Sequence, residues 1–175
     1  SFMDNVFIEK LIVKKKDVKD YLFTLGICLV GAIVILASPF LGQLVPFLGS
    51  IWLLIAAGVI YGIYRLITSR NIEYEYIVTD GDLDIDMIIA QRKRKRIFSA
   101  NCKEFDVVAP YKGQNHDSRL SNATKQIKAV SSMESKGVYF ITLNYNGERT
   151  AVFFEPDERI LKAFRTFIPR KIENY

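Results

Sequence analysis

The sequence of 175 residues is half hydrophobic, carries a net charge of +5 and contains two cysteines and one histidine. Cys28 and Cys102 give no disulfide pattern, which is typical of a protein in a reducing compartment. Residues 1–70 have a net charge of +3 and residues 71–175 a net charge of +2, so the longer part is close to neutral. This balance argues against nucleic-acid binding, which needs a strongly basic surface.

The chain begins with an arm over residues 1–20, in which Ser1 and Phe2 precede Met3 and are interpreted as a tag remnant. Four apolar residues of the arm fall on one helical face, with lysines elsewhere: Phe7, Ile8, Leu11 and Ile12. This pattern predicts an amphipathic helix on the membrane surface. A charged extension that stops translocation needs no helix, and the sequence leaves both readings open.

The segment Tyr21–Tyr64 contains no Asp, Glu, Lys, Arg or His over 44 residues. One membrane-spanning helix needs roughly 20 apolar residues, so the segment is long enough for two. Pro39 and Pro46 bracket a short break, because proline ends or starts a helix more easily than it continues one. We therefore predict a two-helix transmembrane hairpin within residues 21–70. Its spans are expected at about 21–38 and 47–67.

Lysines and arginines lie on the outer flanks of both predicted spans, and the connection between the spans has none. This bias predicts a multi-pass protein of the inner membrane with both termini in the cytoplasm. Gly58 and Gly62 form a GxxxG pattern that permits close helix packing. Packing within the hairpin is favoured over a dimer interface, because the partner helix is already tethered alongside.

Residues 71–175 are predicted to form one cytoplasmic domain, mostly of strands. The alternation of apolar and polar residues predicts seven of them, at about 73–79, 83–87, 94–99, 102–109, 125–131, 137–145 and 148–155. Asn146-Gly147 suits a type I′ hairpin turn, because both of its central residues need positive φ. The polar stretch Tyr111–Ala123 is expected to be a long, mobile loop.

The period then changes to that of a helix. Pro156-Asp157-Glu158 opens it, an apolar stripe follows, and Pro169 ends it. Seven strands followed by one amphipathic helix predict an α+β, mainly β domain. The expected form is a bent seven-stranded antiparallel barrel with the C-terminal helix closing one open end.

This order of elements resembles pleckstrin-homology-like (PH-like) domains. The residues that carry the resemblance are Tyr74-Glu75-Tyr76-Ile77-Val78-Thr79-Asp80-Gly81-Asp82-Leu83, Arg92-Lys93-Arg94-Lys95-Arg96 and the final helix. The whole chain is also similar to an uncharacterised bacterial family with this layout, a domain of unknown function. The resemblance implies a binding or scaffolding role next to the membrane and no known activity.

The basic run Arg92, Lys93, Arg94, Lys95 and Arg96 is the candidate lipid- or phosphate-binding site. One reading is a patch that faces anionic lipid headgroups. The other is a strand whose alternate basic residues pair with neighbouring acids, so that Asp84 or Asp86 meets Arg94 or Arg96. The second reading is favoured, because the domain is nearly neutral and the acids are adjacent.

The sequence offers no catalytic signature. The alternating aspartates fail the calcium-loop pattern, since Ile85 and Gln91 stand where glycine and glutamate are needed. His116 has no triad geometry with its immediate neighbours. We therefore expect no enzyme activity, no metal and no cofactor. The predicted function is a membrane-anchored binding or scaffold module. The alternative function is the sensing of anionic lipids. A membrane protein is a further candidate partner, and it would bind at an open sheet edge or at loop Tyr111–Ala123.

Overall fold

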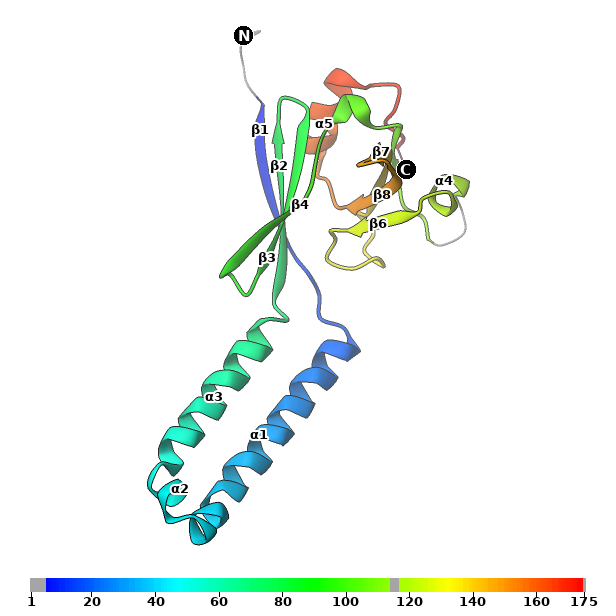
Figure 1. Ribbon diagram of the computed structural model, residues 1–175. Helices are drawn as coiled ribbons and strands as arrows, with labels where there is room; N and C mark the ends of the chain where they lie inside the picture. The colour runs from blue at the N-terminus through cyan, green and yellow to red at the C-terminus, as the bar shows by residue number, and fades with distance from the viewer. Residues whose placement is uncertain (1–5, 114–116, 175) are drawn as a thin grey trace. The chain divides into compact units, whose positions relative to one another are not determined.

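The chain divides into two compact units, each described by itself below. In the computed structural model the described residues are 6–113 and 117–174, without the side chain of residue 48. One unit comprises residues 16–71, and the other comprises residues 1–15 together with 72–175 (Figure 1). The second unit is therefore discontinuous in sequence, which the sequence reading did not anticipate.

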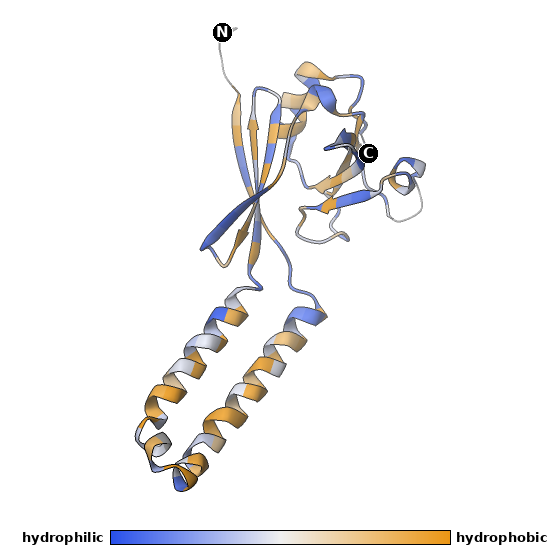
Figure 2. Cartoon of the chain, viewed as in Figure 1, coloured by the Kyte–Doolittle hydropathy of each residue, from blue (hydrophilic) through white to orange (hydrophobic). Residues whose placement is uncertain are grey.

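The unit over residues 16–71 is helical: α1 spans Val18–Leu44, α2 Pro46–Ser50 and α3 Trp52–Thr68. Asp17 and Asp20 form a capping box at the start of α1. With 27 residues, α1 is the one helix of the described chain that is long and apolar enough to cross a membrane. The helix α3 is apolar but shorter, at 17 residues. Both appear mostly hydrophobic in Figure 2.

The prediction that the first helix ends at Ser38 is wrong, because α1 continues through Pro39 to Leu44. Proline at position 39 cannot donate a hydrogen bond to the carbonyl of Ile35, four residues earlier. Two other donors reach that carbonyl oxygen instead, the Ser38 hydroxyl at 2.9 Å and the Trp52 indole at 3.3 Å. The helix therefore tolerates the proline without an orphaned carbonyl group.

Sheet A contains β1 (Phe7–Val13), β2 (Ile72–Thr79), β3 (Asp82–Ile89) and β4 (Lys93–Asn101). The strands are antiparallel and lie in the order β1-β2-β3-β4. A register shift in the β3–β4 pair falls between Ile85 and Asp86. The turn between these strands holds Ala90 at φ 56° and Gln91 at φ 57°, a left-handed conformation that is uncommon without glycine.

The amphipathic helix expected in the N-terminal arm is wrong, because this segment is the edge strand β1. Ile8 and Ile12 face the core, while Phe7, Leu11 and Val13 are exposed on the other face. Because apolar residues occupy both faces of this strand, their spacing in the sequence resembles the apolar face of a helix. The antiparallel partner of β1 is β2, more than 60 residues later in the sequence, so no local pattern indicates the pairing.

Sheet B contains β5 (Val107–Pro110), β6 (Lys125–Lys128), β7 (Tyr139–Tyr145) and β8 (Glu148–Phe154), in the order β5-β7-β8-β6. All seven predicted strands have a counterpart, although η1 (Cys102–Glu104) replaces the start of the fourth. The fully antiparallel arrangement is wrong, because β6 runs parallel to β8. The tight β7–β8 hairpin occupies one side of β8, and the connection after β6 carries the chain back to begin β7. The strands form two four-stranded sheets, and a single seven-stranded barrel is not established.

The Asn146-Gly147 turn is confirmed, with φ of 51° and 80° at its two central residues. The C-terminal helix is also confirmed, as α5 (Glu158–Phe167), whose N-cap Asp157 accepts the Ile160 N–H at 3.0 Å. Its buried stripe packs into the main core with apolar residues of both sheets. For this turn and this helix, the local sequence pattern was therefore sufficient to predict the structure.

Tyr76 joins the strands of sheet A to segments that flank sheet B. Its buried hydroxyl donates to the carbonyl oxygen of Ala129 and accepts the N–H of Glu155 at 2.9 Å. Burial raises the pKa of this hydroxyl, so it remains a neutral donor. The carboxylate of Glu155 in turn accepts hydrogen bonds from the N–H and hydroxyl of Ser131.

A second, smaller core lies on the other side of sheet B. It contains Val107, Phe140 and Phe153 from the strands, with Tyr111 and Leu120 packed against it. Part of the predicted loop Tyr111–Ala123 is the four-residue helix α4 (Ser118–Ser121). The loop prediction is thus wrong for α4, which packs against this core through Leu120, and Tyr111 packs there from the start of the same segment.

Candidate functional site

The predicted basic run lies at the β3–β4 turn and along the start of β4, the edge strand of sheet A. Figure 2 shows this start of β4 as a hydrophilic stretch. Arg92 belongs to the turn, and the next four residues alternate between the two faces of the sheet. The run is thus divided into two pairs, Arg94 with Arg96 and Lys93 with Lys95.

Arg94 and Arg96 are bound to acids on neighbouring strands. The carboxylate of Asp86 accepts hydrogen bonds from both guanidinium groups, each at 2.9 Å. Arg94 also contacts Glu75 at 3.2 Å, and Arg96 contacts Asp84 at 3.3 Å. The predicted pairing of Asp84 and Asp86 with these arginines is confirmed.

This network acts on the protonation of its members. The hydrogen bond from Arg96 is the largest of several contacts that hold the pKa of Asp86 below its usual value, against the effect of burial. The hydrogen bond that Arg94 donates to Glu75 raises the pKa of Arg94, and the one that Arg96 donates to Asp86 raises the pKa of Arg96. The two arginines thereby favour the ionised form of the buried Asp86 carboxylate.

Lys93 and Lys95 lie on the opposite face, across from Ile89 and Met87 of β3. Both lysines are exposed, and neither forms an ion pair with any residue that the structure describes. They are the members of the basic run that remain able to meet an external anion without breaking the acidic network.

The cross-strand register places the lysines at a particular end of the sheet. Ile72 pairs with Ile89, which pairs with Lys93, and the N–H of Lys14 donates to the carbonyl oxygen of Ile72 at 2.9 Å. Lys14 and Lys93 therefore lie at the two ends of one cross-strand row of sheet A, which runs through Ile72 and Ile89. Both chain connections to the unit over residues 16–71 leave from this end. The opposite end carries the turn Asp80-Gly81.

Gly58 and Gly62 do not pack in the way that the sequence favoured. A Cβ atom added at either position would meet nothing within 4 Å outside the neighbouring helix backbone. Gly31 of α1 provides the close contact instead, because a Cβ there would collide with Ile63 of α3. Gly58 and Gly62 are therefore not the positions at which the two helices pack on each other, and the dimer interface stays a prediction.

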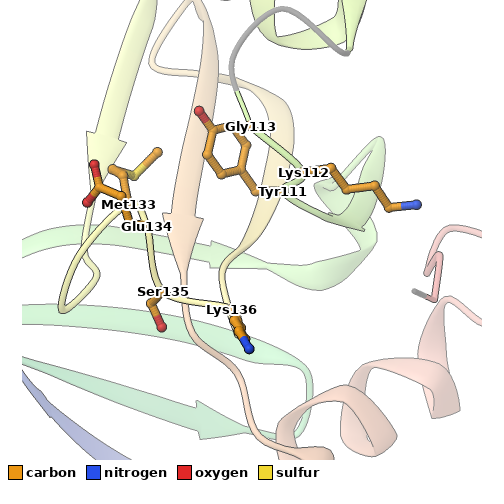
Figure 3. A pocket seen from close by; sticks show the side chains of 7 residues that line it. All are labelled: Tyr111, Lys112, Gly113, Met133, Glu134, Ser135 and Lys136. Carbon is orange, nitrogen blue, oxygen red and sulfur yellow. The ribbon is translucent and has the colours of Figure 1, made fainter.

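A second candidate region surrounds Tyr111, on the outer side of sheet B. Figure 3 shows a hollow between the segment of Tyr111 and Lys112 and the segment from Met133 to Lys136. Its volume is about 810 Å³. An adjoining hollow reaches Phe153 and the side chains of β6. Segments that are far apart in the sequence build these walls, so no sequence motif predicted them.

One wall of this region is held by Arg119 of α4. Its guanidinium group binds the Asp117 carboxylate at 2.5 Å and the Glu173 carboxylate at 3.0 Å. The same group lies over the Phe140 ring, 5.4 Å from its centroid. Arg119 thereby fastens α4 to the sheet and to the C-terminal segment, and it neutralises both acids.

The remaining chemical candidates are not brought together. Among residues 6–113 and 117–174, no three His, Cys, Asp or Glu side chains are grouped so that they could hold a metal ion. Asp80 lies in a turn and accepts the Val6 N–H, apart from the face that carries Asp84. Cys102 is buried, and burial raises the pKa of its thiol. His116 lies outside the described residues.

The family model of the bacterial PH-like domain DUF6106 matches residues 4–174. The chain belongs to this family. The matched range includes the helical segment 16–71. The family predicted from the order of elements is thus confirmed. No curated protein and no solved structure matches the chain.

Proposed function

We propose that this member of the bacterial PH-like family is a membrane-anchored, non-catalytic binding module. Residues 16–71 form a two-helix transmembrane hairpin, and the PH-like domain lies on the cytoplasmic side with both termini. The observation that carries the proposal is the surface of α1 and α3, where side chains such as Leu25, Leu29 and Leu53 are exposed. Such a surface is stable in lipid and not in water.

The length of α3 does not oppose this proposal. Its 17 residues reach the lower limit for a spanning helix, and the preceding α2 extends the apolar segment. At the other end of the hairpin, Asp20 and Arg70 form an ion pair at 3.7 Å, and Arg70 also covers the Phe23 ring. These charges suit the headgroup region, where polar groups remain hydrated.

Labelling of single cysteines tests the topology. In a chain with Cys28→Ser and Cys102→Ala, Gln43→Cys is expected to react with a membrane-impermeant maleimide on intact cells. Lys136→Cys is expected to react only after lysis. Reaction of both sites before lysis, or of Lys136→Cys alone, would contradict the proposed orientation.

The alternative function, contact with anionic lipid headgroups, is supported by the register of sheet A. Lys14, Lys93 and Lys95 belong to the end of the sheet that continues into the proposed anchor. A short tether of this kind gives the lysines a high effective concentration at the bilayer surface. Each basic residue near an anionic surface contributes about 1 kcal/mol. We propose that Lys93 and Lys95 make this contact, with Arg92 beside them, and that Arg94 and Arg96 serve the fold.

Hydrogen exchange of the full chain in nanodiscs tests this contact. Residues 89–95 are expected to exchange more slowly in discs with phosphatidylglycerol than in neutral discs, and salt should abolish the difference. Lys93→Gln with Lys95→Gln should also abolish it, whereas Lys103→Gln with Lys162→Gln should not. Equal exchange in both lipids would leave β4 as a purely structural edge strand.

A further inference from the structure

The hollows around Tyr111 lie beside the open edge of sheet B, at β6. In the described chain β6 is the last strand of its sheet and pairs with β8 alone. Gln126 and Lys128 of β6 line a hollow that is also lined by Tyr111, Met133 and Phe153. An unpaired strand edge next to an apolar hollow provides both backbone partners and side-chain pockets for an extended peptide.

The floor of this region is apolar and firmly placed. The Tyr111 ring packs against Phe153 with centroids 5.3 Å apart, and the Tyr111 N–H donates to the carbonyl oxygen of Val138. Leu120 of α4 closes one side, and α4 is itself fixed by Arg119. The hollow is therefore part of the folded sheet and does not depend on a partner for its shape.

The rim of the region is basic. Three lysines line it, from different segments of the chain: Lys112, Lys128 and Lys136. The acids on the walls are mostly neutralised, since Asp117 and Glu173 bind Arg119. Glu134 is the remaining acid on the lining, and it accepts a hydrogen bond from Ser132 at 2.5 Å. The charge of this surface complements a negative partner.

We propose that β6 and the Tyr111 hollow bind an extended acidic peptide segment of a partner protein. The peptide adds to the free edge of β6. Its side chains that face the hollow place apolar groups against Tyr111 and Met133 and carboxylates near Lys112 and Lys128. This site is separate from the β3–β4 turn, so it does not depend on the proposed headgroup contact.

The probe is a fluorescent seven-residue peptide, Glu-Thr-Leu-Thr-Phe-Thr-Glu, whose Glu, Leu and Phe side chains share one face when it is extended. It is added to the full chain in neutral nanodiscs. Binding is expected to slow hydrogen exchange in residues 125–128 and to leave residues 89–95 unchanged. Lys112→Glu with Lys128→Glu should weaken binding by about tenfold or more, because attraction becomes repulsion. Lys103→Glu with Lys162→Glu changes the net charge equally and should leave binding unaltered.

Several results would overturn the proposal. The first is that the probe does not bind. The second is that a peptide with lysine in place of glutamate binds as tightly as the probe. The third is that both charge-reversal variants weaken binding equally. Protection at residues 89–95 in place of 125–128 would also contradict it. If the Lys112 and Lys128 variant reduced association with phosphatidylglycerol vesicles and left peptide binding intact, the surface would be a lipid contact.

Discussion

The N–H of Lys14 donates to the carbonyl oxygen of Ile72 at 2.9 Å, although the helical unit over residues 16–71 separates them in sequence. The strands β1 and β2 are thus the two arms of an antiparallel hairpin whose connection is the proposed membrane anchor. This relationship makes the anchor an insertion within the PH-like domain and explains why the arm before it belongs to the sheet.

Replacement of residues 15–71 by Asn-Gly should therefore leave the PH-like domain folded. Asn-Gly favours the type I′ turn that joins two adjacent antiparallel strands. The shortened chain is expected to be monomeric without detergent and to give a mainly β circular dichroism spectrum. A fragment of residues 72–175 lacks β1 and the burial of Ile8 and Ile12, which is worth about 3 kcal/mol. It should unfold at a clearly lower temperature, and equal stability would contradict the role of β1.

Asp86→Asn should lower the free energy of unfolding of this shortened domain by about 1–2 kcal/mol, since it removes two charge-assisted hydrogen bonds from a buried group. The lowered pKa of Asp86 means that its contribution is complete above its usual pKa of 3.8 and is lost as the pH falls toward the lowered value. Urea titrations should show a difference between the two proteins at pH 7 that shrinks below pH 4. An unchanged difference at low pH would show that the ion pairs are not its cause.

Ser38→Ala with Trp52→Phe should destabilise the helical unit by about 1–2 kcal/mol, because the Ile35 carbonyl loses both donors. Addition of Pro39→Ala should restore most of this loss, since alanine provides the missing N–H four residues after Ile35. Thermal unfolding in detergent measures both effects. Failure of the third substitution to rescue would show that Ser38 and Trp52 act through packing.

Gly58→Leu with Gly62→Leu should leave the hairpin folded, because neither position meets a neighbour within 4 Å. If these glycines form a contact between two copies of the chain, the double variant should lower energy transfer between labelled chains in bilayers. Gly31→Leu is the matched control, since its side chain would collide with Ile63 and destabilise the hairpin itself. Unchanged energy transfer in the Gly58 and Gly62 variant would contradict the hypothesis that these glycines form a dimer interface.

Local patterns were sufficient for much of this fold. The hairpin β7–β8 follows from Asn146-Gly147, and α5 follows from its capping residue and apolar stripe. The pairing of Asp84 and Asp86 with arginines was also predictable, because β3 and β4 are adjacent in sequence. In each case the residues that interact are close enough along the chain for spacing to reveal them.

Contacts between distant segments were not predictable in this way. The strand β1 depends on β2 beyond the helical unit, and the parallel position of β6 depends on which side of β8 remains free. The path of α1 through Pro39 depends on the indole of Trp52, which belongs to the next helix but one. The Tyr111 hollow likewise combines segments that become neighbours only in the folded sheet.

The central claim is that residues 16–71 anchor a PH-like domain in the membrane, and cell fractionation tests it most directly. After a wash with alkaline carbonate, the full chain should stay in the membrane pellet, and the chain with Asn-Gly in place of residues 15–71 should be entirely soluble. Recovery of the full chain in the soluble fraction, or of the shortened chain in the washed membranes, would contradict the account.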